Sequence, residues 1–154
     1  MSRTYATFFA DGLLFGLPAT EVLELANPRE LTRVPLAPGT LAGLMNLRGQ
    51  IIAAIDLRRR LGLPPRPAGQ LAMNVVLRTA DEPVSLLVDR VGEVIDLGDD
   101  TFEAAPETVR GVARELLRGV HKLPGRLLLL LDPQRIIEGV AAEARKPLSP
   151  PATS

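Results

Sequence analysis

Cysteine and tryptophan are absent from this chain of 154 residues, and aromatic residues make up only 3% of it. Without cysteine the chain has no disulfide, no thiol nucleophile and no thiolate metal site. The scarcity of aromatic rings argues against stacking of single-stranded nucleic-acid bases. The one histidine, His121, has no partners at the spacing of a metal site or a catalytic triad. We therefore expect His121 to be a strand residue with an ordinary hydrogen bond.

The chain also lacks an excess of charge and a long apolar run. Lys plus Arg and Asp plus Glu number 18 each, so the formal net charge is zero, which argues against binding driven by phosphate attraction. No apolar run approaches the roughly 18 residues of a membrane-spanning helix. Arg3 precedes an apolar stretch, as in a signal peptide, but Asp11-Gly12 interrupts the stretch and predicts a hairpin instead. We expect a cytoplasmic protein with no direct membrane insertion.

The remaining composition is that of an ordinary globular chain. Hydrophobic residues account for 46% and charged residues for 23%, close to the averages for folded domains. At this length roughly 68–70% of the surface of the unfolded chain can be buried. The sequence therefore predicts one domain, or two very small barrels that share a core.

One pattern occurs twice: a strand, a tight turn, a second strand, and then a short helix. Its first copy spans residues 43–62 and its second spans 119–139, with matched residues Gly43 and Gly119, Leu47 and Leu123, Gly49 and Gly125, and Asp56 and Asp132. The glycine after each turn tip can adopt the positive φ that a tight turn requires, and each aspartate is a good N-cap. The tip residues differ, Arg48 against Pro124. A turn requires neither, so Arg48 is the first candidate for a functional residue.

About ten short strands, two short capped helices and no long amphipathic helix favour an all-β barrel architecture. The expected strands are residues 5–10, 13–17, 22–25, 44–47, 50–55, 73–79, 84–89, 91–97, 116–123 and 126–131. Residues 63–69 contain three prolines and form the clearest linker. We expect one domain over residues 1–146, with approximate subdomains 12–66 and 71–139. The first strand and the C-terminal helix are candidates for exchange between the subdomains, and residues 147–154 are expected to be a disordered tail.

Nothing in the sequence assembles an active site. Glycine-rich phosphate loops are absent, and Asp99-Asp100 follows a glycine in a turn, where aspartate is common. The run Arg58-Arg59-Arg60 is open to two interpretations: phosphate or RNA contact, or cations that complement the dipole at the end of a short helix. A nucleic-acid-binding SH3-like barrel therefore remains an alternative to an adaptor, and no metal or cofactor is expected.

Asn46-Leu47-Arg48-Gly49, followed by an apolar strand and Asp56-Leu57-Arg58, resembles the CheW family of bacterial chemotaxis coupling proteins. Further matches are Glu21-Val22 after the first hairpin, residues 87–94 (LVDRVGEV), and the ending Leu-Leu-Asp132-Pro. The resemblance covers about Tyr5 to Glu138 and implies two packed SH3-like five-stranded β-barrel subdomains that share an apolar seam.

The resemblance also implies a function. Such proteins are non-catalytic adaptors between the cytoplasmic tips of methyl-accepting chemoreceptors and the regulatory domain of a CheA-type histidine kinase. By matching position, the receptor-facing residues are Val22, Glu24, Leu25, Gly43 and Arg48, while no kinase-binding residue matches sharply enough to be named. A coupling protein of a non-flagellar chemosensory system would carry the same residues and remains an alternative.

Overall fold

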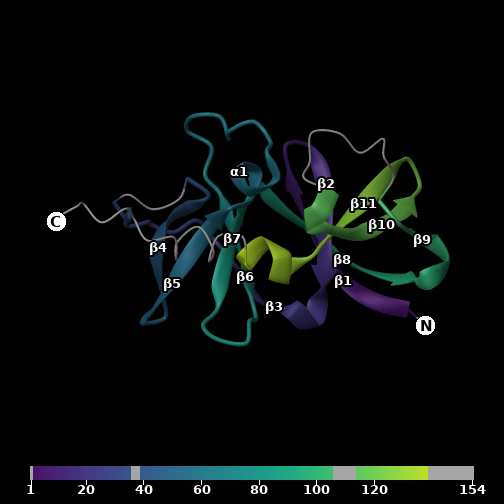
Figure 1. Cartoon of the computed structure of the whole chain (residues 1–154), viewed down its shortest axis with the longest axis horizontal. Helices are drawn as coiled ribbons and strands as arrows, with labels where there is room; N and C mark the ends of the chain where they lie inside the picture. The colour runs from purple at the N-terminus through teal and green to yellow at the C-terminus, as the bar shows by residue number, and fades with distance from the viewer. Residues whose placement is uncertain (1, 36–38, 106–113, 139–154) are drawn as a thin grey trace.

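The computed structural model describes residues 2–35, 39–105 and 114–138, and it consists mostly of strands in two sheets (Figure 1). Sheet A has the strand order β8-β1-β2-β11-β10-β9, and sheet B has the order β3-β6-β7-β5-β4. The strands are β1 (Ser2–Ala10), β2 (Leu13–Pro18), β3 (Val22–Ala26), β4 (Leu41–Leu47), β5 (Gln50–Asp56), β6 (Met73–Leu77), β7 (Val84–Val88), β8 (Arg90–Gly98), β9 (Phe102–Glu103), β10 (Leu117–Leu123) and β11 (Arg126–Leu131). The predicted all-β class is confirmed.

The two sheets repeat one arrangement. In sheet B a hairpin, β6–β7, lies between β3 and the β5–β4 hairpin, and β5 pairs with β7 in parallel. In sheet A the hairpin β1–β2 lies between β8 and the β11–β10 hairpin, and β11 pairs with β2 in parallel. The repeat found in the sequence therefore corresponds to a repeated arrangement of strands, and each sheet forms one of two SH3-like subdomains.

Each sheet takes strands from both halves of the chain. The first hairpin, β1–β2, pairs with β8 and β11 from the C-terminal half, whereas β6–β7 pairs with β3 and β5 from the N-terminal half. The chain passes from sheet A to sheet B between β2 and β3 and returns at Asp89, which lies between β7 and β8 and whose amide donates to the carbonyl of Phe9, 2.9 Å away. The exchange is therefore of whole hairpins, which ties the two sheets together.

The core has a shared part and two local parts. The largest buried cluster contains Phe8 and Phe15 from sheet A together with Ile55, Val75 and Leu86 from sheet B. Smaller clusters fill each subdomain separately, one built on Met45, Leu47, Ile52 and Val76 and the other on Tyr5, Leu128 and Leu130. Because burial of apolar surface is the main stabilising term, the shared cluster holds the two subdomains as one unit. The predicted apolar seam is confirmed.

The predicted turns follow from backbone conformation. Asp11 and Gly12 have φ angles of 51° and 75°, the positive pair that a two-residue hairpin loop of type I′ requires. The opening hairpin is thus confirmed. Short 3-10 turns occur at η1 (Ala19–Glu21), η2 (Asp99–Thr101) and η3 (Arg114–Leu116), and the first of them leads into β3. The two-residue strand β9 is missing from the sequence prediction, since it is too short to show alternation.

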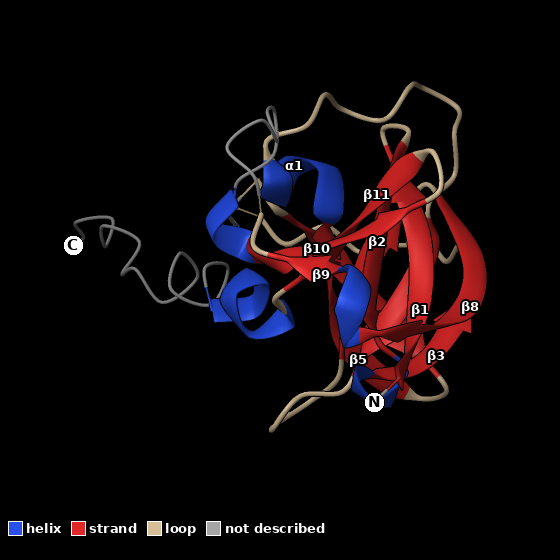
Figure 2. Ribbon diagram, turned by 90° about the vertical axis from the view of Figure 1, so that its right-hand side faces the viewer, coloured by secondary structure: helices blue, strands red, loops and turns tan. Residues whose placement is uncertain are grey.

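Helices are few and short, as Figure 2 shows. Helix α1 (Leu57–Leu61) begins at Asp56, whose carboxylate accepts from the amides of Arg58 and Arg59, and it ends at Gly62 with φ 79°. Both predicted ends of this helix are correct. Residues 133–138 are also helical, and Asp132 accepts from the amide of Arg135, 3.2 Å away. The expected end of that helix near Gly139, the tail over residues 147–154 and most of the loop after Thr101 lie outside the described residues.

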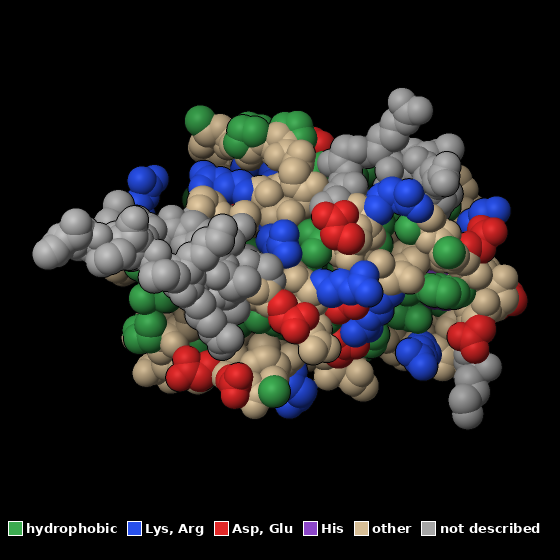
Figure 3. Space-filling view, in the orientation of Figure 1, with side chains coloured by type: hydrophobic (Ala, Val, Ile, Leu, Met, Phe, Trp, Pro, Cys, Tyr) green, Lys and Arg blue, Asp and Glu red, His purple; other side chains and the backbone are tan. Residues whose placement is uncertain are grey.

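Within the described part of the chain, no helix is long and apolar enough to span a bilayer. Figure 3 shows basic and acidic side chains interspersed over one face of the molecule, without a large area of one sign. That mixture agrees with the zero net charge of the whole sequence.

Candidate functional site

The candidate site is built around the β4–β5 hairpin, called the Arg48 hairpin below. Leu47 pairs with Gln50, so Arg48 and Gly49 alone form the loop, and their φ angles are 53° and 86°. Arginine is unfavourable in a left-handed conformation, because its Cβ approaches the following carbonyl. Asn46 supports the turn by accepting from the amide of Gly49, 2.8 Å away. A strained, exposed residue held by its neighbours is a feature of functional sites.

Arg48 reaches across to β3, where its Nη2 lies 3.2 Å from Oε2 of Glu24. Strands β3 and β4 are the two outer strands of sheet B, so this ion pair joins opposite edges of one sheet. Thr32, in the connection between the two strands, also pairs with Leu44 of β4 through two backbone hydrogen bonds of 2.8 Å. The sheet therefore curls until its edges meet. The Arg48 side chain is 76% exposed and that of Glu24 only 24%, so the arginine is available to a partner.

Strand β3 has the predicted alternation, with the apolar residues on the outer side. Leu23 and Leu25 are about two-fifths exposed, while Val22 and Glu24 are half-buried. Glu24 therefore faces Arg48, while its neighbour Leu25 is on the outer side of the strand. Glu21, just before this strand, pairs with Arg118 of sheet A through contacts of 2.9 and 3.3 Å. The edge of sheet B is thus fixed to sheet A at the point where the candidate surface begins.

Gly43 differs from the other residues predicted to face a receptor, because it is buried. A Cβ at this position would lie 2.7 Å from the carbonyl oxygen of Thr32, and residue pairing shifts by one between Leu41 and Gly43. The close approach that the glycine permits is therefore made by the chain's own connection between β3 and β4. Gly43 can influence the surface only by placing the Arg48 hairpin.

A buried ionic cluster lies between the two sheets, and the sequence did not reveal it. Arg58 Nε and Nη2 donate to the two carboxylate oxygens of Asp89 at 2.9 and 2.6 Å, and the Arg58 side chain is only 7% exposed. Arg66 of the proline-rich linker donates to Asp89 at 3.1 Å, and the amide of Asp11 donates at 2.8 Å. Asp89 thus joins α1, the linker, the first hairpin and the crossing point between the sheets.

The charges of this cluster are strongly coupled. The hydrogen bond to Asp89 raises the pKa of Arg58 above its ordinary value, against the effect of burial. Burial alone would raise the pKa of Asp89, but the hydrogen bonds from Arg58, the amide of Asp11 and Arg66 outweigh it and hold that pKa below its ordinary value. Both groups are therefore charged at neutral pH, and their role is to hold elements together.

All three arginines that suggested nucleic-acid contact make contacts within the chain. Besides the Arg58 cluster, Arg59 donates to the carbonyl of Gly39 at 2.8 Å and lies 3.6 Å from Asp56. Arg60 donates to the carbonyls of Arg135 and Ile136, each 3.1 Å away. Each of the three side chains is thus held by a contact within the chain, so the run does not form a free basic patch.

His121 lies on β10 and is almost fully buried. Its Nδ1 is 2.8 Å from Oγ1 of Thr101, which is the ordinary hydrogen bond expected, while its Nε2 has no partner among the described residues. Burial lowers the pKa of His121, partly opposed by Asp99 and Asp100, so the ring is neutral at pH 7. Among the described residues, no group of three or more His, Cys, Asp or Glu is arranged to hold a metal ion.

Two SH3-like subdomains with a shared core define the class of this chain as a small protein of paired β-barrels. The CheW-like domain model matches residues 4–141, nearly the whole chain. The chain therefore belongs to the CheW-like family, as its motifs indicated.

Relatives agree with this assignment. The chain is 27% identical to "Chemotaxis protein CheW" of Bacillus subtilis over 140 residues, which cover 91% of this chain and 90% of that protein. It is 31% identical to the protein of that name from Thermotoga maritima over 114 residues, 74% of each chain. A crystal structure of scaffolding protein TtCheW from Thermoanaerobacter tengcongensis superposes with a TM-score of 0.77 at 26% identity, covering 86% of this chain and 90% of that one.

Proposed function

We propose that this protein is a non-catalytic cytoplasmic adaptor that couples the cytoplasmic tips of methyl-accepting chemoreceptors to the regulatory domain of a CheA-type histidine kinase. Family membership supports the chemotaxis setting, and the similar crystal structure is that of a scaffolding protein. Coupling requires surfaces and rigidity, and the shared core of the two sheets supplies the rigidity.

The observation that carries the proposal is the conformation of Arg48. A left-handed arginine at a hairpin tip costs folding free energy, and the matching tip in the other subdomain has Pro124 without a positive φ. A residue retained at such a cost is best explained by recognition. The receptor-binding surface then consists of Arg48, Glu24, Leu25 and Val22 directly, with Gly43 acting through the position of the hairpin.

The test is charge reversal at this tip. Arg48→Glu should change the free energy of unfolding by less than about 0.5 kcal/mol, because the side chain is exposed and away from the core. It should abolish receptor-dependent activation of the kinase in a reconstituted phosphorylation assay, since reversed charge at a binding surface can cost several kcal/mol. Binding to the isolated kinase should fall less than binding to the receptor.

Arg126→Glu is the matched control, because it makes the same charge change on the first residue of β11, beside the equivalent turn. It should couple normally. If Arg48→Glu also couples normally, the receptor surface lies elsewhere. The double variant Glu24→Arg, Arg48→Glu then separates the pair from the individual charges: restored coupling means that the ion pair shapes the surface, and continued loss means that each charge meets the receptor.

A further inference from the structure

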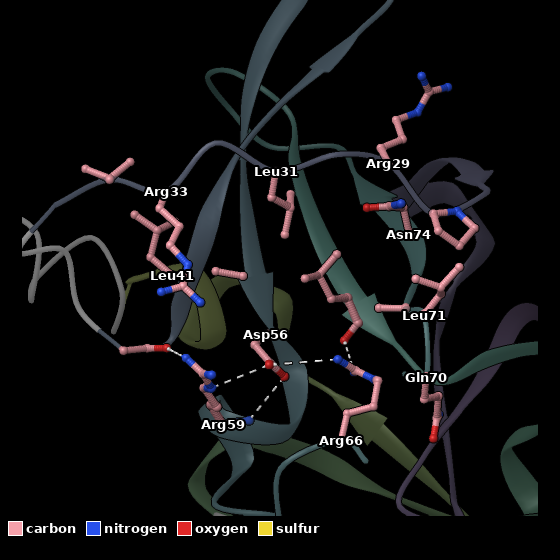
Figure 4. Close-up of a pocket in the computed structure, with 16 residues that line it drawn as sticks. Arg29, Leu31, Arg33, Leu41, Asp56, Arg59, Arg66, Gln70, Leu71 and Asn74 are labelled. Carbon is pink, nitrogen blue, oxygen red and sulfur yellow. Dashed lines mark hydrogen bonds and ion pairs between the residues drawn. The ribbon is translucent and has the colours of Figure 1, made fainter. Parts of the chain in front are cut away.

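A pocket of about 530 Å³ lies in the sheet B subdomain, at the end of the Arg48 hairpin opposite its tip (Figure 4). Its walls are the connection between β3 and β4, the start of β4, the first turn of α1, and the segment from Arg66 to Ala72. Strand β5 runs from Gln50, beside the hairpin tip, to Asp56 in the pocket. At about 3.3 Å per strand residue, the two sites are on the order of 20 Å apart. The two sites are therefore far enough apart for each to bind a partner of its own.

The pocket has more basic than acidic side chains. Four arginines line it, Arg29, Arg33, Arg59 and Arg66, against the single carboxylate of Asp56. That carboxylate already caps α1 and lies 3.6 Å from Arg59. Arg66 is directed to Asp89. The remaining two, Arg29 and Arg33, are exposed and have no hydrogen bond or ion pair with any described residue.

Two of the guanidinium groups face a common space. In Figure 4 the side chain of Arg33 points toward Arg59 and Asp56, whereas Arg29 points away from the pocket. Arg59 is already paired with Asp56 and with the carbonyl of Gly39, whereas Arg33 has no counter-ion among the described residues, and arginine binds carboxylates with a planar pair of donors. The mouth of the pocket is therefore suited to an incoming carboxylate.

The rest of the lining is apolar. Leu31 and Leu41 point into the pocket in Figure 4, and Leu71 lies at its edge with 71% of its surface exposed. A bare inorganic anion would leave these side chains in water. No aromatic side chain lines the pocket among the described residues, so it offers no surface on which a base could stack. The chemistry fits an acidic peptide segment with apolar side chains.

We propose that this pocket binds an acidic segment of a protein partner, with a carboxylate between Arg33 and Arg59 and an apolar side chain against Leu31 and Leu71. The volume is within the range of pockets that enclose small ligands, about 300–1,000 Å³, and has room for more than one side chain. This site is separate from the Arg48 surface and does not depend on the proposed receptor role.

The probe is a synthetic peptide, acetyl-Glu-Leu-Glu-Glu-Leu-amide, titrated into the 15N-labelled full chain and followed by NMR. Amide shifts should be confined to the neighbourhood of Arg33, Arg59 and Leu71, and they should weaken as salt is raised. The neutral counterpart, with Gln in place of each Glu, should bind at least tenfold more weakly. Arg33→Glu should lose at least tenfold in affinity for the acidic peptide.

The matched control is Arg3→Glu, which makes the same charge change on β1 of sheet A, and it should bind like the wild type. Equal losses in Arg3→Glu and Arg33→Glu would show nothing more than long-range charge and overturn the proposal. Shifts centred on β3 or on Arg48 and Gly49 would place the peptide at the other surface. Displacement by equal concentrations of an oligothymidylate would identify a nucleic-acid site, and displacement by inorganic phosphate would identify a simple anion site. Each of these outcomes overturns the pocket proposal and leaves the proposed role of Arg48 to its own test.

Discussion

The two hairpin units of the molecule, β4–β5 with α1 and β10–β11 with residues 133–138, differ in few positions that matter. Each has a one-residue shift in pairing beside a glycine, Gly43 with φ 154° or Gly119 with φ 159°. Each has a two-residue loop ending in glycine and an aspartate N-cap with an arginine three residues later. These shared features are the ones the fold requires, since a Cβ on either glycine would meet backbone oxygen at 2.7 Å.

Among the matched pairs that differ, three involve a tip, a buried charge or a core residue of one subdomain. Arg48 at the first tip is matched by Pro124 at the second. Arg58, two residues after the first cap, is buried against Asp89, whereas its match Gln134 is exposed. Met45 in β4 is matched by His121 in β10, both buried. The two units thus share their turn and cap residues, whereas the tip residue, the buried charge and one core residue differ between them.

The largest effect on stability is expected when Arg58 of the ionic cluster is replaced by glutamine, the residue at the matched position of the second unit. Arg58→Gln should lower the free energy of unfolding by about 3 kcal/mol, because among the described residues it leaves the buried Asp89 with Arg66 as its one charged partner. The reverse exchange, Gln134→Arg, should stay within about 0.5 kcal/mol. Urea denaturation of both variants at pH 7 measures the difference.

The stability difference between the wild type and Arg58→Gln should depend on pH. Asp89 has a lowered pKa in the folded chain, so its contribution to stability is present above the unfolded carboxyl pKa of about 3.9 and is lost as pH falls through the folded value. The gap between the wild type and Arg58→Gln should therefore shrink in acid. Equal stabilities of the two proteins at pH 7 would mean that the cluster contributes no net stability.

The next effect is expected at the helix caps. Asp132→Ala should cost about 1 kcal/mol, and Asp56→Ala about 2 kcal/mol, at the upper end of the range for caps. The difference arises because Asp56 is buried, accepts from two amides and lies near both Arg59 and Arg66. Calorimetric unfolding of the two variants checks the order. Equal losses would show that the extra contacts of Asp56 are energetically silent.

A smaller effect of opposite sign is expected at the turn tip. Arg48→Asn should stabilise the fold by about 0.5 kcal/mol, because asparagine tolerates the left-handed conformation better than arginine. The variant should nevertheless lose receptor coupling. Pro124→Asn, at the matched tip, should change neither stability nor coupling. A destabilised Arg48→Asn would indicate that the ion pair with Glu24 outweighs the strain, which thermal unfolding at low and high salt can decide.

The smallest effect at neutral pH is expected for His121→Met, which introduces the residue of β4 into β10. Burial lowers the pKa of His121 in the folded chain, so the wild type should lose stability as pH falls below the unfolded histidine value of about 6.5 toward the folded one. The methionine variant should lack this loss. Unfolding curves at pH 7 and at about pH 5.5 test it, and parallel changes in both proteins would assign the loss to other groups.

Local chemistry made most of the fold predictable. Asp11-Gly12, Gly49, Asp56 and Gly62 each have a backbone preference that is recognisable in a single sequence, and each occupies the predicted position. The repeat predicted two units because the same turn and cap residues recur at one offset. Strand β9 escaped prediction because two residues carry no periodicity, and it forms only because Phe102 and Glu103 meet β10.

The candidate site was predictable from the sequence only at a position whose residue the local structure does not require. Arg48 stood out because the matched position has proline, but its partner Glu24 lies on a strand at the opposite edge of the sheet, which no local pattern indicates. The cluster of Arg58 and Asp89 is formed by residues 31 positions apart, so the charged run was mistaken for a surface feature. Long-range pairing of single charges leaves no periodic signal.

The exchange of hairpins between the sheets bears on how this protein is made. The first hairpin is synthesised early, but Leu14 of β2 can pair with Leu128 only after β11 has been synthesised. At about 5–20 residues per second, its hydrogen-bonding edge is open for roughly 6 to 23 s of synthesis. A strand edge that stays unpaired for this time can pair with other chains. Nascent copies on one messenger are therefore the stage at which this pair of small barrels is most exposed to misassembly.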